Sequence, residues 1–405
     1  MIRLAWRNIW RNQRRSLITI LSIGCGFSAI MFGQSMIHSV QIQLVEKSTG
    51  IITGHIRVMN KNCKDLKIPD EDIENPQPIE KALEGIPGIQ VFGQRILFTG
   101  LISSPITSKG VLVCAVQPEK ESKIIKIPQY ITQGRFFSGS GREIVLGDKL
   151  AEELEIRLGE KVVLLSQGRD GSMAAEAFRL SGIYHTGSTS FDGQIIYVPL
   201  VPCQEMLSMQ GKVNDFVIRV KGLEQIERVR QEISRVLEPY SEVKTYTWKD
   251  VDRELVGIQK FQNGILLVVL VIIFGIVTLG IVNTLLMSLF ERIREFGVLM
   301  AIGAKPKIIL RLILLESTLL GIMGLMFGLS LGSLLIAYFG RYGLPLPIGE
   351  ALSYFIPFDS VIYLRFSWSR HWVAIVGVFL TSFISGAIPA LRASRLIVAK
   401  ALRHV

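Results

Sequence analysis

Long apolar windows separate the charged segments of this sequence. The windows that carry at most one charged residue are 16–45, 261–290, 312–340 and 371–391. Each can supply the roughly 20 apolar residues with which a helix crosses about 30 Å of hydrocarbon. The pattern therefore predicts four transmembrane helices, at 17–40, 262–290, 311–338 and 371–391.

Basic residues flank the predicted spans unevenly. The segments 1–16, 291–310 and 392–405 are rich in Lys and Arg, whereas the loop 339–370 has only Arg341, Arg365 and Arg370. Basic loops are usually retained on the cytoplasmic side. We therefore expect both termini in the cytoplasm, with 41–255 and the loop 339–370 outside.

The first 16 residues form a pattern of their own. Ile2, Trp6 and Ile9 recur at helical spacing, Trp10 lies beside them, and arginines occupy other positions. This predicts a cytoplasmic helix in the membrane interface, and the alternative is a mere stop signal of arginines. The apolar run that follows is longer than a signal-peptide core, so we interpret it as an uncleaved anchor.

The segment 41–255 has the alternation and turn residues of a soluble domain that mixes helices and strands. Two β-α-β passes, at about 41–119 and 212–255, predict a discontinuous split β-α-β subdomain. A mainly β subdomain at about 120–211 interrupts it. The expected fold class is thus a membrane α-helical protein with four transmembrane helices and a large α+β extracytoplasmic domain inserted between helices 1 and 2.

Composition and charge agree with this division. With 49% hydrophobic and 20% charged residues, the chain is too apolar to be disordered. The segment 41–255 is nearly balanced in charge, so the net charge of +11 belongs to the membrane part and predicts no nucleic-acid surface. Cys25 lies in the first span, and a disulfide among Cys63, Cys114 and Cys203 stays open.

Signatures of catalysis are missing from the sequence. It contains no phosphate-binding loop, no H-E-x-x-H and no G-x-S-x-G, and its five histidines are scattered. We expect a non-catalytic membrane subunit that itself binds no metal and no cofactor, with ATP and Mg²⁺ held by a partner.

Small residues and one acid mark the third span. The glycines at helical spacing, which predict close helix packing, are Gly321, Gly324, Gly328 and Gly332. Glu316 is the single carboxylate of the span, and such an acid is a functional candidate. Because Arg311 is nearby in sequence, a structural role at the cytoplasmic interface is favoured over a proton relay.

Three membrane-side motifs resemble one known family. They are Phe290-Glu-Arg-Ile-Arg-Glu-Phe-Gly-Val-Leu-Met-Ala-Ile-Gly-Ala304, Ala5-Trp-Arg-Asn-Ile-Trp-Arg-Asn12 with Arg14-Arg15, and Ile388-Pro-Ala-Leu-Arg-Ala-Ser-Arg395. Gly147-Asp-Lys-Leu-Ala151 with Leu158-Gly159 adds an outer-domain match. The family is that of the mechanotransmission (type VII) ABC permeases related to the macrolide exporter, and the lipoprotein-releasing transmembrane subunits are the closest members. The tail after Leu396 departs from the family's Asp-Pro-x-Glu-Ala-Leu.

The resemblance implies a multi-pass subunit of the bacterial inner membrane with its large domain in the periplasm. It pairs with a second permease, identical or related, and with two copies of an ABC ATPase. In that family the cytoplasmic link, here 291–310, is a coupling helix that docks on the ATPase. The residues expected to couple are Glu291, Arg292, Arg294, Glu295, Phe296, Gly297, Met300 and Gly303.

For lipoprotein-releasing members, acyl chains enter between the permeases and leave to a periplasmic lipoprotein carrier. Large apolar residues at the outer ends of the first two spans are candidate contacts for this lipid, although lipid-facing residues would look the same: Met31, Phe32, Met36, Phe261 and Ile265. Two alternatives stay open. The chain could drive export of peptides or small amphiphiles with a periplasmic adaptor, or be a signalling permease that controls a cell-wall hydrolase.

Overall fold

A computed structural model describes residues 1–137, 141–346 and 361–395. Their contacts divide the chain into two compact units. Within the described residues, the membrane unit comprises 1–41, 259–345 and 361–395, and the mixed unit comprises 42–137, 141–258 and Leu346.

In the part of the chain that the structure describes, four helices are long and apolar enough to cross a membrane. These are α2 (Gln13–Ser48), α10 (Arg253–Glu291), α12 (Pro306–Tyr342) and α14 (Trp368–Ser394). The sequence analysis is confirmed in their number. Each helix extends past its predicted span, because helical hydrogen bonding continues beyond the apolar window that hydropathy detects.

Shorter elements accompany these helices. They are α1 (Ile2–Arg11), α11 (Ile293–Ala301), and an antiparallel pair of short strands, β11 (Leu344–Pro345) and β12 (Val361–Ile362). The expected coupling helix at 291–310 is divided: α11 ends at Ala301, and α12 already begins at Pro306. Gly303 separates them with a φ of +100°, a conformation that glycine adopts without strain. Proline at the first turn of α12 is compatible with a helix start.

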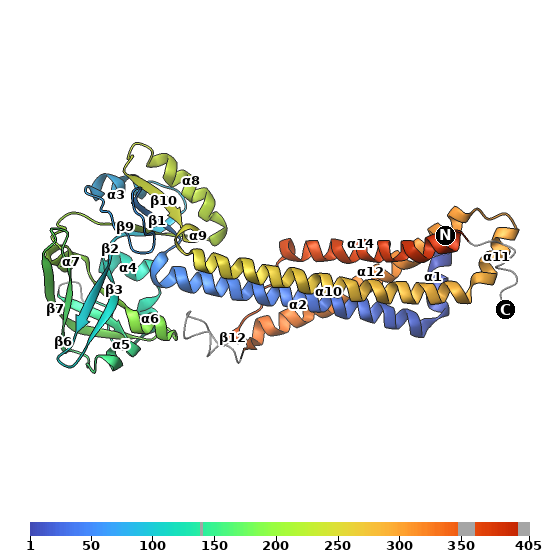
Figure 1. The fold of residues 1–405 in the computed structure, drawn as a ribbon, viewed down its shortest axis with the longest axis horizontal. Coiled ribbons are helices and arrows are strands. Elements are labelled where there is room, and N and C mark those ends of the chain that lie inside the picture. Colours follow the sequence, from blue (N-terminus) through green and yellow to red (C-terminus); the bar gives the residue numbers. More distant parts are fainter. Residues whose placement is uncertain (138–140, 347–360, 396–405) are drawn as a thin grey trace. The chain divides into compact units, whose positions relative to one another are not determined.

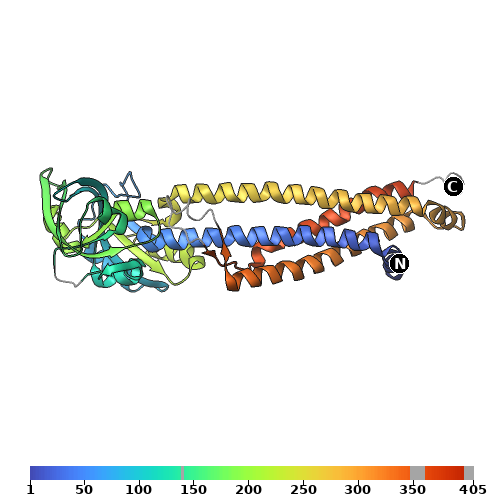
Figure 2. The same ribbon diagram turned by 90° about the horizontal axis from the view of Figure 1, so that it is seen from below.

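The glycine stripe of α12 lies against α2 and α14. A Cβ atom at Gly324 would approach Ile23 to 2.6 Å, and one at Gly328 would approach the carbonyl oxygen of Gly24 to 2.6 Å. At Gly321 it would come within 2.5 Å of Ser382 Oγ on α14. These contacts are too short for a side chain, so the stripe allows the helices to pack backbone to backbone, as Figures 1 and 2 show for α12 beside α14 and α2.

The mixed unit combines strands with short helices. Its strands are β1 (Ile56–Asn60), β2 (Ile89–Ser103), β3 (Ser108–Val116), β4 (Ile131–Gly134), β5 (Glu143–Gly147), β6 (Lys161–Gln167), β7 (Met173–Tyr184), β8 (Ile195–Pro199), β9 (Asp215–Val220) and β10 (Val243–Thr247). Its helices are α3 (Pro76–Glu84), α4 (Pro118–Ile124), α5 (Asp148–Glu153), α6 (Thr189–Gln194), α7 (Leu200–Met206), α8 (Ile226–Val236) and α9 (Trp248–Val251). A π-helical turn at Thr49–Thr53 and 3-10 turns at Ile127–Tyr130 and Leu223–Gln225 complete it.

One half of the sheet has the strand order β10-β1-β9-β2. Strand β9 lies antiparallel between β1 and β2, and β1 lies antiparallel between β9 and β10. Each parallel pair is thus joined by a helix and separated by one strand, which is the split β-α-β arrangement. The two connecting helices, α3 and α8, contact each other, and α8 packs on β10 (Figure 1).

The other half closes on itself through strand β2. The first part of β2 pairs with β9, and the last residues of β2, Leu101 to Ser103, pair with β6. From there the pairings run through β7, β5, β8 and β3 back to β2. The 15-residue strand β2 is therefore shared by both halves, and bending one half away would break its ladder.

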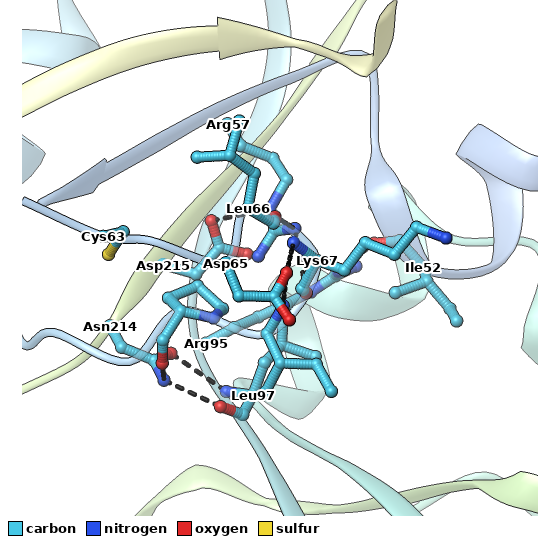
Figure 3. Close-up of polar contacts among 12 residues, drawn as sticks. Ile52, Arg57, Cys63, Asp65, Leu66, Lys67, Arg95, Leu97, Asn214 and Asp215 are labelled. Atoms are coloured by element: carbon cyan, nitrogen blue, oxygen red, sulfur yellow. Dashed lines mark hydrogen bonds and ion pairs between the residues drawn. The ribbon is translucent and has the colours of Figure 1, made fainter. Parts of the chain in front are cut away.

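Buried polar groups join these strands. Arg57 Nε donates to Asp215 Oδ1 at 3.0 Å, and both side chains are fully buried. Arg95 and Glu121 form a second buried ion pair. Beside them, the Asn214 side chain accepts from Leu97 N at 2.9 Å and donates to Leu97 O at 2.8 Å, which extends the β9 pairing by one residue (Figure 3).

The core of the mixed unit surrounds Cys114, Tyr184 and Tyr197. Tyr184 Oη donates to Ile195 O and Tyr197 Oη donates to Ile51 O, each at 2.8 Å, so both buried hydroxyls are paired. Burial raises the pKa of Cys114 to about 12. All four cysteines, which lie in the described ranges, are free thiols.

Candidate coupling site

The linker helix α11 turns one side toward the other helices of the membrane unit. Ile293, Phe296 and Gly297 are buried. Phe296 is only 1% exposed and belongs to an apolar cluster contributed by α1, α10, α11, α12 and α14: Ala5, Leu289, Phe296, Ile309, Leu312, Ile313, Ala390 and Ala393. Met300 packs at the edge of this cluster. Phe296 and Met300, which the sequence analysis expected to couple to the ATPase, therefore lie on the side of the helix that packs in the chain's own core.

The opposite side of α11 is open. Arg294, Val298 and Leu299 of the helix and Ile302 at its C-cap are exposed, and we call these four residues the linker face. Ile302 is 76% exposed, although it is a large apolar residue. The sequence analysis did not select Val298 or Ile302. These exposed residues lie on the side of α11 away from Phe296. They could be recognised only after the buried side of the helix was known.

A buried acid lies behind the linker helix. Glu316 on α12 accepts from Arg292 Nη1 at 3.1 Å and from Asn8 Nδ2 at 2.6 Å. Arg292 also donates from Nε to Glu295 at 3.2 Å and stacks over the Phe296 ring at 4.9 Å. Charge and hydrogen bonding thus hold Arg292 and Glu316 in place. The sequence suggested Arg311 as the neighbour of Glu316, whereas in the structure Glu316 accepts hydrogen bonds from Arg292 and Asn8.

The N-terminal segment around the end of α1 also contacts the start of the linker. Arg11 Nη1 donates to Glu295 at 2.9 Å, and Arg15, at the start of α2, pairs with Glu291. Asn12 Nδ2 donates to Glu291 at 3.3 Å. Burial raises the pKa of Glu295, but the hydrogen bonds from Arg292 and Arg11 outweigh this and hold it below its usual value. We call these contacts the N-terminal clamp.

The apolar residues of α1 divide between two sides. Ala5 and Ile9 are buried, whereas Ile2, Trp6 and Trp10 are exposed, with the two indole rings edge to face at 5.9 Å. The sequence placed Ile9 together with Ile2 and Trp6 on one lipid-facing side. In the structure Ile9 points inward, because Asn8 and Ile9 lie on the side that packs near Glu316 and α12.

The candidate lipid contacts do not form one group. Met31 is fully buried, where its sulfur would be 3.0 Å from a Cβ at Gly332. Phe32 packs edge to face on Phe339 at 5.7 Å. Phe261 and Ile265 are exposed on α10, and Met36 is half-buried. Met31 therefore serves the packing of α2 on α12 and is not open to a bound lipid.

Family comparisons match both units. A model described as MacB-like periplasmic core domain matches residues 16–236, and one described as FtsX-like permease C-terminal matches residues 267–397. The chain belongs to the MacB-like permease family. This permease has four candidate membrane helices in its described residues, and its mixed unit is the family's α+β periplasmic domain.

Similar proteins support the same family assignment. The permease is 26% identical to an uncharacterised ABC transporter permease of Methanocaldococcus jannaschii over 96% of this chain and 92% of that protein. It is 22% identical to the lipoprotein-releasing system transmembrane protein LolE of Haemophilus influenzae over 97% and 96%, respectively. It is 25% identical to the macrolide export ATP-binding/permease protein MacB of Bdellovibrio bacteriovorus over 97% of this chain and 60% of MacB.

Among solved structures, the periplasmic region of MacB from Actinobacillus actinomycetemcomitans aligns with 52% of this chain and 97% of its own, at 13% identity and a TM-score of 0.37. Together the family models and relatives identify an ABC transporter permease subunit of the Lol and MacB type.

Proposed function

We propose that this permease extracts lipoproteins from the outer leaflet of the inner membrane and passes them to a periplasmic carrier. The observation that supports this most is the similarity to LolE, which runs through both units and nearly the whole length of that protein. The similarity to MacB supports a second candidate, export of peptides or small amphiphiles with a periplasmic adaptor.

Energy would come from a separate ABC ATPase in two copies, since the 405 residues contain no phosphate-binding loop. We place its docking site on the linker face of α11. Val298, Leu299 and Ile302 offer apolar side chains to a groove, and Arg294 offers a charge at the rim. Movement of α11 would reach α12 through the buried Arg292–Glu316 pair, as a rigid-body switch.

The proposed topology has both termini in the cytoplasm and the mixed unit inserted between the first and second spans on the outside. The basic segments 1–16 and 291–310 support it. A reporter fused after Val405 should read cytoplasmic, and one inserted after Gly139 should read periplasmic. Two cytoplasmic readings would contradict the four-span topology.

The decisive experiment for substrate is reconstitution of the permease with its ATPase and any second permease in vesicles loaded with acylated lipoprotein. We expect ATP-dependent transfer of lipoprotein to a soluble carrier, and none with a hydrolysis-deficient ATPase. The same lipoprotein without its acyl chains is the matched control. If amphiphilic peptides stimulate ATP hydrolysis while acylated lipoprotein neither stimulates it nor leaves the vesicle, the export candidate replaces lipoprotein release.

A further inference from the structure

A histidine and two aspartates from different elements of the mixed unit converge at one point. Asp148 opens α5, His185 follows β7, and Asp192 lies in α6. His185 Nδ1 is 2.7 Å from Asp148 Oδ2 and 3.4 Å from Asp192 Oδ2, and the three ligand atoms lie within 4.8 Å of one another. Because 37 residues separate Asp148 from His185, the cluster cannot be recognised in the sequence.

We propose that Asp148, His185 and Asp192 bind a divalent cation of the zinc class, with His185 Nδ1 and one oxygen from each aspartate as ligands. Zinc binds nitrogen and carboxylate oxygen at about 2.0–2.2 Å, which sets tetrahedral ligands about 3.3 Å apart. The two distances from His185 Nδ1 bracket that value. Imidazole in the set favours zinc over magnesium or calcium, which prefer oxygen alone.

The buried ligand is oriented before any ion arrives. Asp192 is 2% exposed, and its carboxylate accepts from Thr186 N at 3.1 Å and from Thr186 Oγ1 at 2.7 Å. Hydrogen bonds of this kind fix the carboxylates of metal sites. Asp148 and His185 are 45% and 55% exposed, so an ion can reach the site from solvent.

Close packing holds the two acidic elements together. Gly147 precedes Asp148, and a Cβ atom at this position would overlap the backbone of Asp192. The approach of α5 to α6 therefore depends on glycine and does not rest on flexible side chains. Two carboxylates held this close repel each other unless a proton or a cation lies between them.

A buried hydroxyl in the same turn has no partner. Ser188 is fully buried, its amide donates to Thr186 Oγ1, and its carbonyl accepts from Asp192 N at 2.8 Å. Its Oγ makes no hydrogen bond to any part of the chain that the structure describes. Three protein ligands leave a coordination position for water, and an ion with bound water would bring a hydrogen-bond partner to this turn.

The test is zinc titration of the purified full-length permease in detergent, against a chromophoric chelator. We expect one site per chain that is lost or weakened more than about tenfold in both His185→Ala and Asp148→Asn, whose exposed side chains can be replaced without unfolding the protein. Asp170→Asn is the matched control, because Asp170 is an exposed aspartate of the same unit bonded to Ser172, and it should bind like wild type.

Cobalt supplies a second measurement that does not depend on affinity. Wild-type protein with Co²⁺ should show visible absorption bands that His185→Ala lacks. Equal zinc affinity in wild type and His185→Ala, or a site that prefers Ca²⁺ and ignores the histidine, would overturn the assignment. In that case His185 and Asp148 form only an exposed ion pair.

Discussion

The buried ion pairs of the mixed unit contrast with the exposed pair at the N-terminal clamp of the membrane unit. In the mixed unit, Arg57–Asp215 and Arg95–Glu121 are sealed from water; the first pair joins strands β1 and β9, and the second joins strand β2 to helix α4. At the linker, Arg11–Glu295 leaves each partner about half exposed. A buried pair penalises any state that opens it, whereas an exposed pair can exchange with water at little cost. The buried pairs thus resist opening of the mixed unit, whereas the exposed pair of the N-terminal clamp can open at little cost.

The largest expected effect comes from opening a buried pair. Arg95→Met leaves the buried Glu121 without its partner, so we expect a loss of about 3–5 kcal/mol in the free energy of unfolding of the mixed unit. Trp248 is the single tryptophan of that unit and reports its unfolding once the other four are replaced by phenylalanine. The double variant Arg95→Met/Glu121→Leu should recover most of the loss. A loss below about 1 kcal/mol in the single variant would contradict the comparison.

The pKa of His55 provides a test of burial in the same unit. Burial and then Arg219 lower the pKa of His55 to about 4, against 6.5 for a free histidine. The unfolded chain therefore binds the proton more tightly, and stability should fall as the pH drops from about 6.5 to 4. The expected loss is about 2–3 kcal/mol. His55→Gln should remove this part of the pH dependence of stability while leaving the part that comes from the carboxylates. If the variant and the wild type have the same pH profile of stability, His55 is open to water.

Some of these features could be predicted from the sequence, and others could not. Hydropathy identified the four long helices, because each apolar window is a local property of the chain. The inward side of α11 was missed, since a nine-residue helix with Phe296, Leu299 and Met300 offers more than one apolar side, and only α12 and α14 decide between them. The cluster at His185 was missed for a related reason, because its ligands meet through the tertiary fold.

Asn8 links the N-terminal helix α1 to a buried acid, because its side chain donates a hydrogen bond to Glu316. Asn8→Leu removes a hydrogen bond to a charged group, and we expect about 1.5–3 kcal/mol of destabilisation of α1 on the membrane unit. Protease cleavage after Arg7 or Arg11 should become faster. Arg3→Leu is the control for the changed charge and apolarity of α1. It should leave the rate of cleavage after Arg11 unchanged. Equal acceleration in both variants would show that the hydrogen bond from Asn8 does not hold α1 on the membrane unit.

The linker face should show an effect on association and not on folding. Ile302→Asp places a charge in the proposed interface with the ATPase, so we expect it to weaken association by more than about 1 kcal/mol, roughly tenfold in dissociation constant. Met173→Asp introduces the same charge at an exposed methionine of the mixed unit. Pull-down of the ATPase should separate the two variants. Equal recovery, with both proteins folded, would place the docking site elsewhere.

The smallest expected effect is at the N-terminal clamp. Arg11→Ala should change the free energy of unfolding by less than about 0.5 kcal/mol, and a double-mutant cycle with Glu295→Ala should give a coupling of about 0.2–1 kcal/mol, smaller at high salt. Transport should nevertheless respond, because weakening the clamp shifts the balance between held and released α11. The charge-swapped protein Arg11→Glu/Glu295→Arg should restore both coupling and transport. A coupling energy as large as that of Arg95 with Glu121 would mean that the clamp is a fixed part of the fold, and the contrast between the two units would fail.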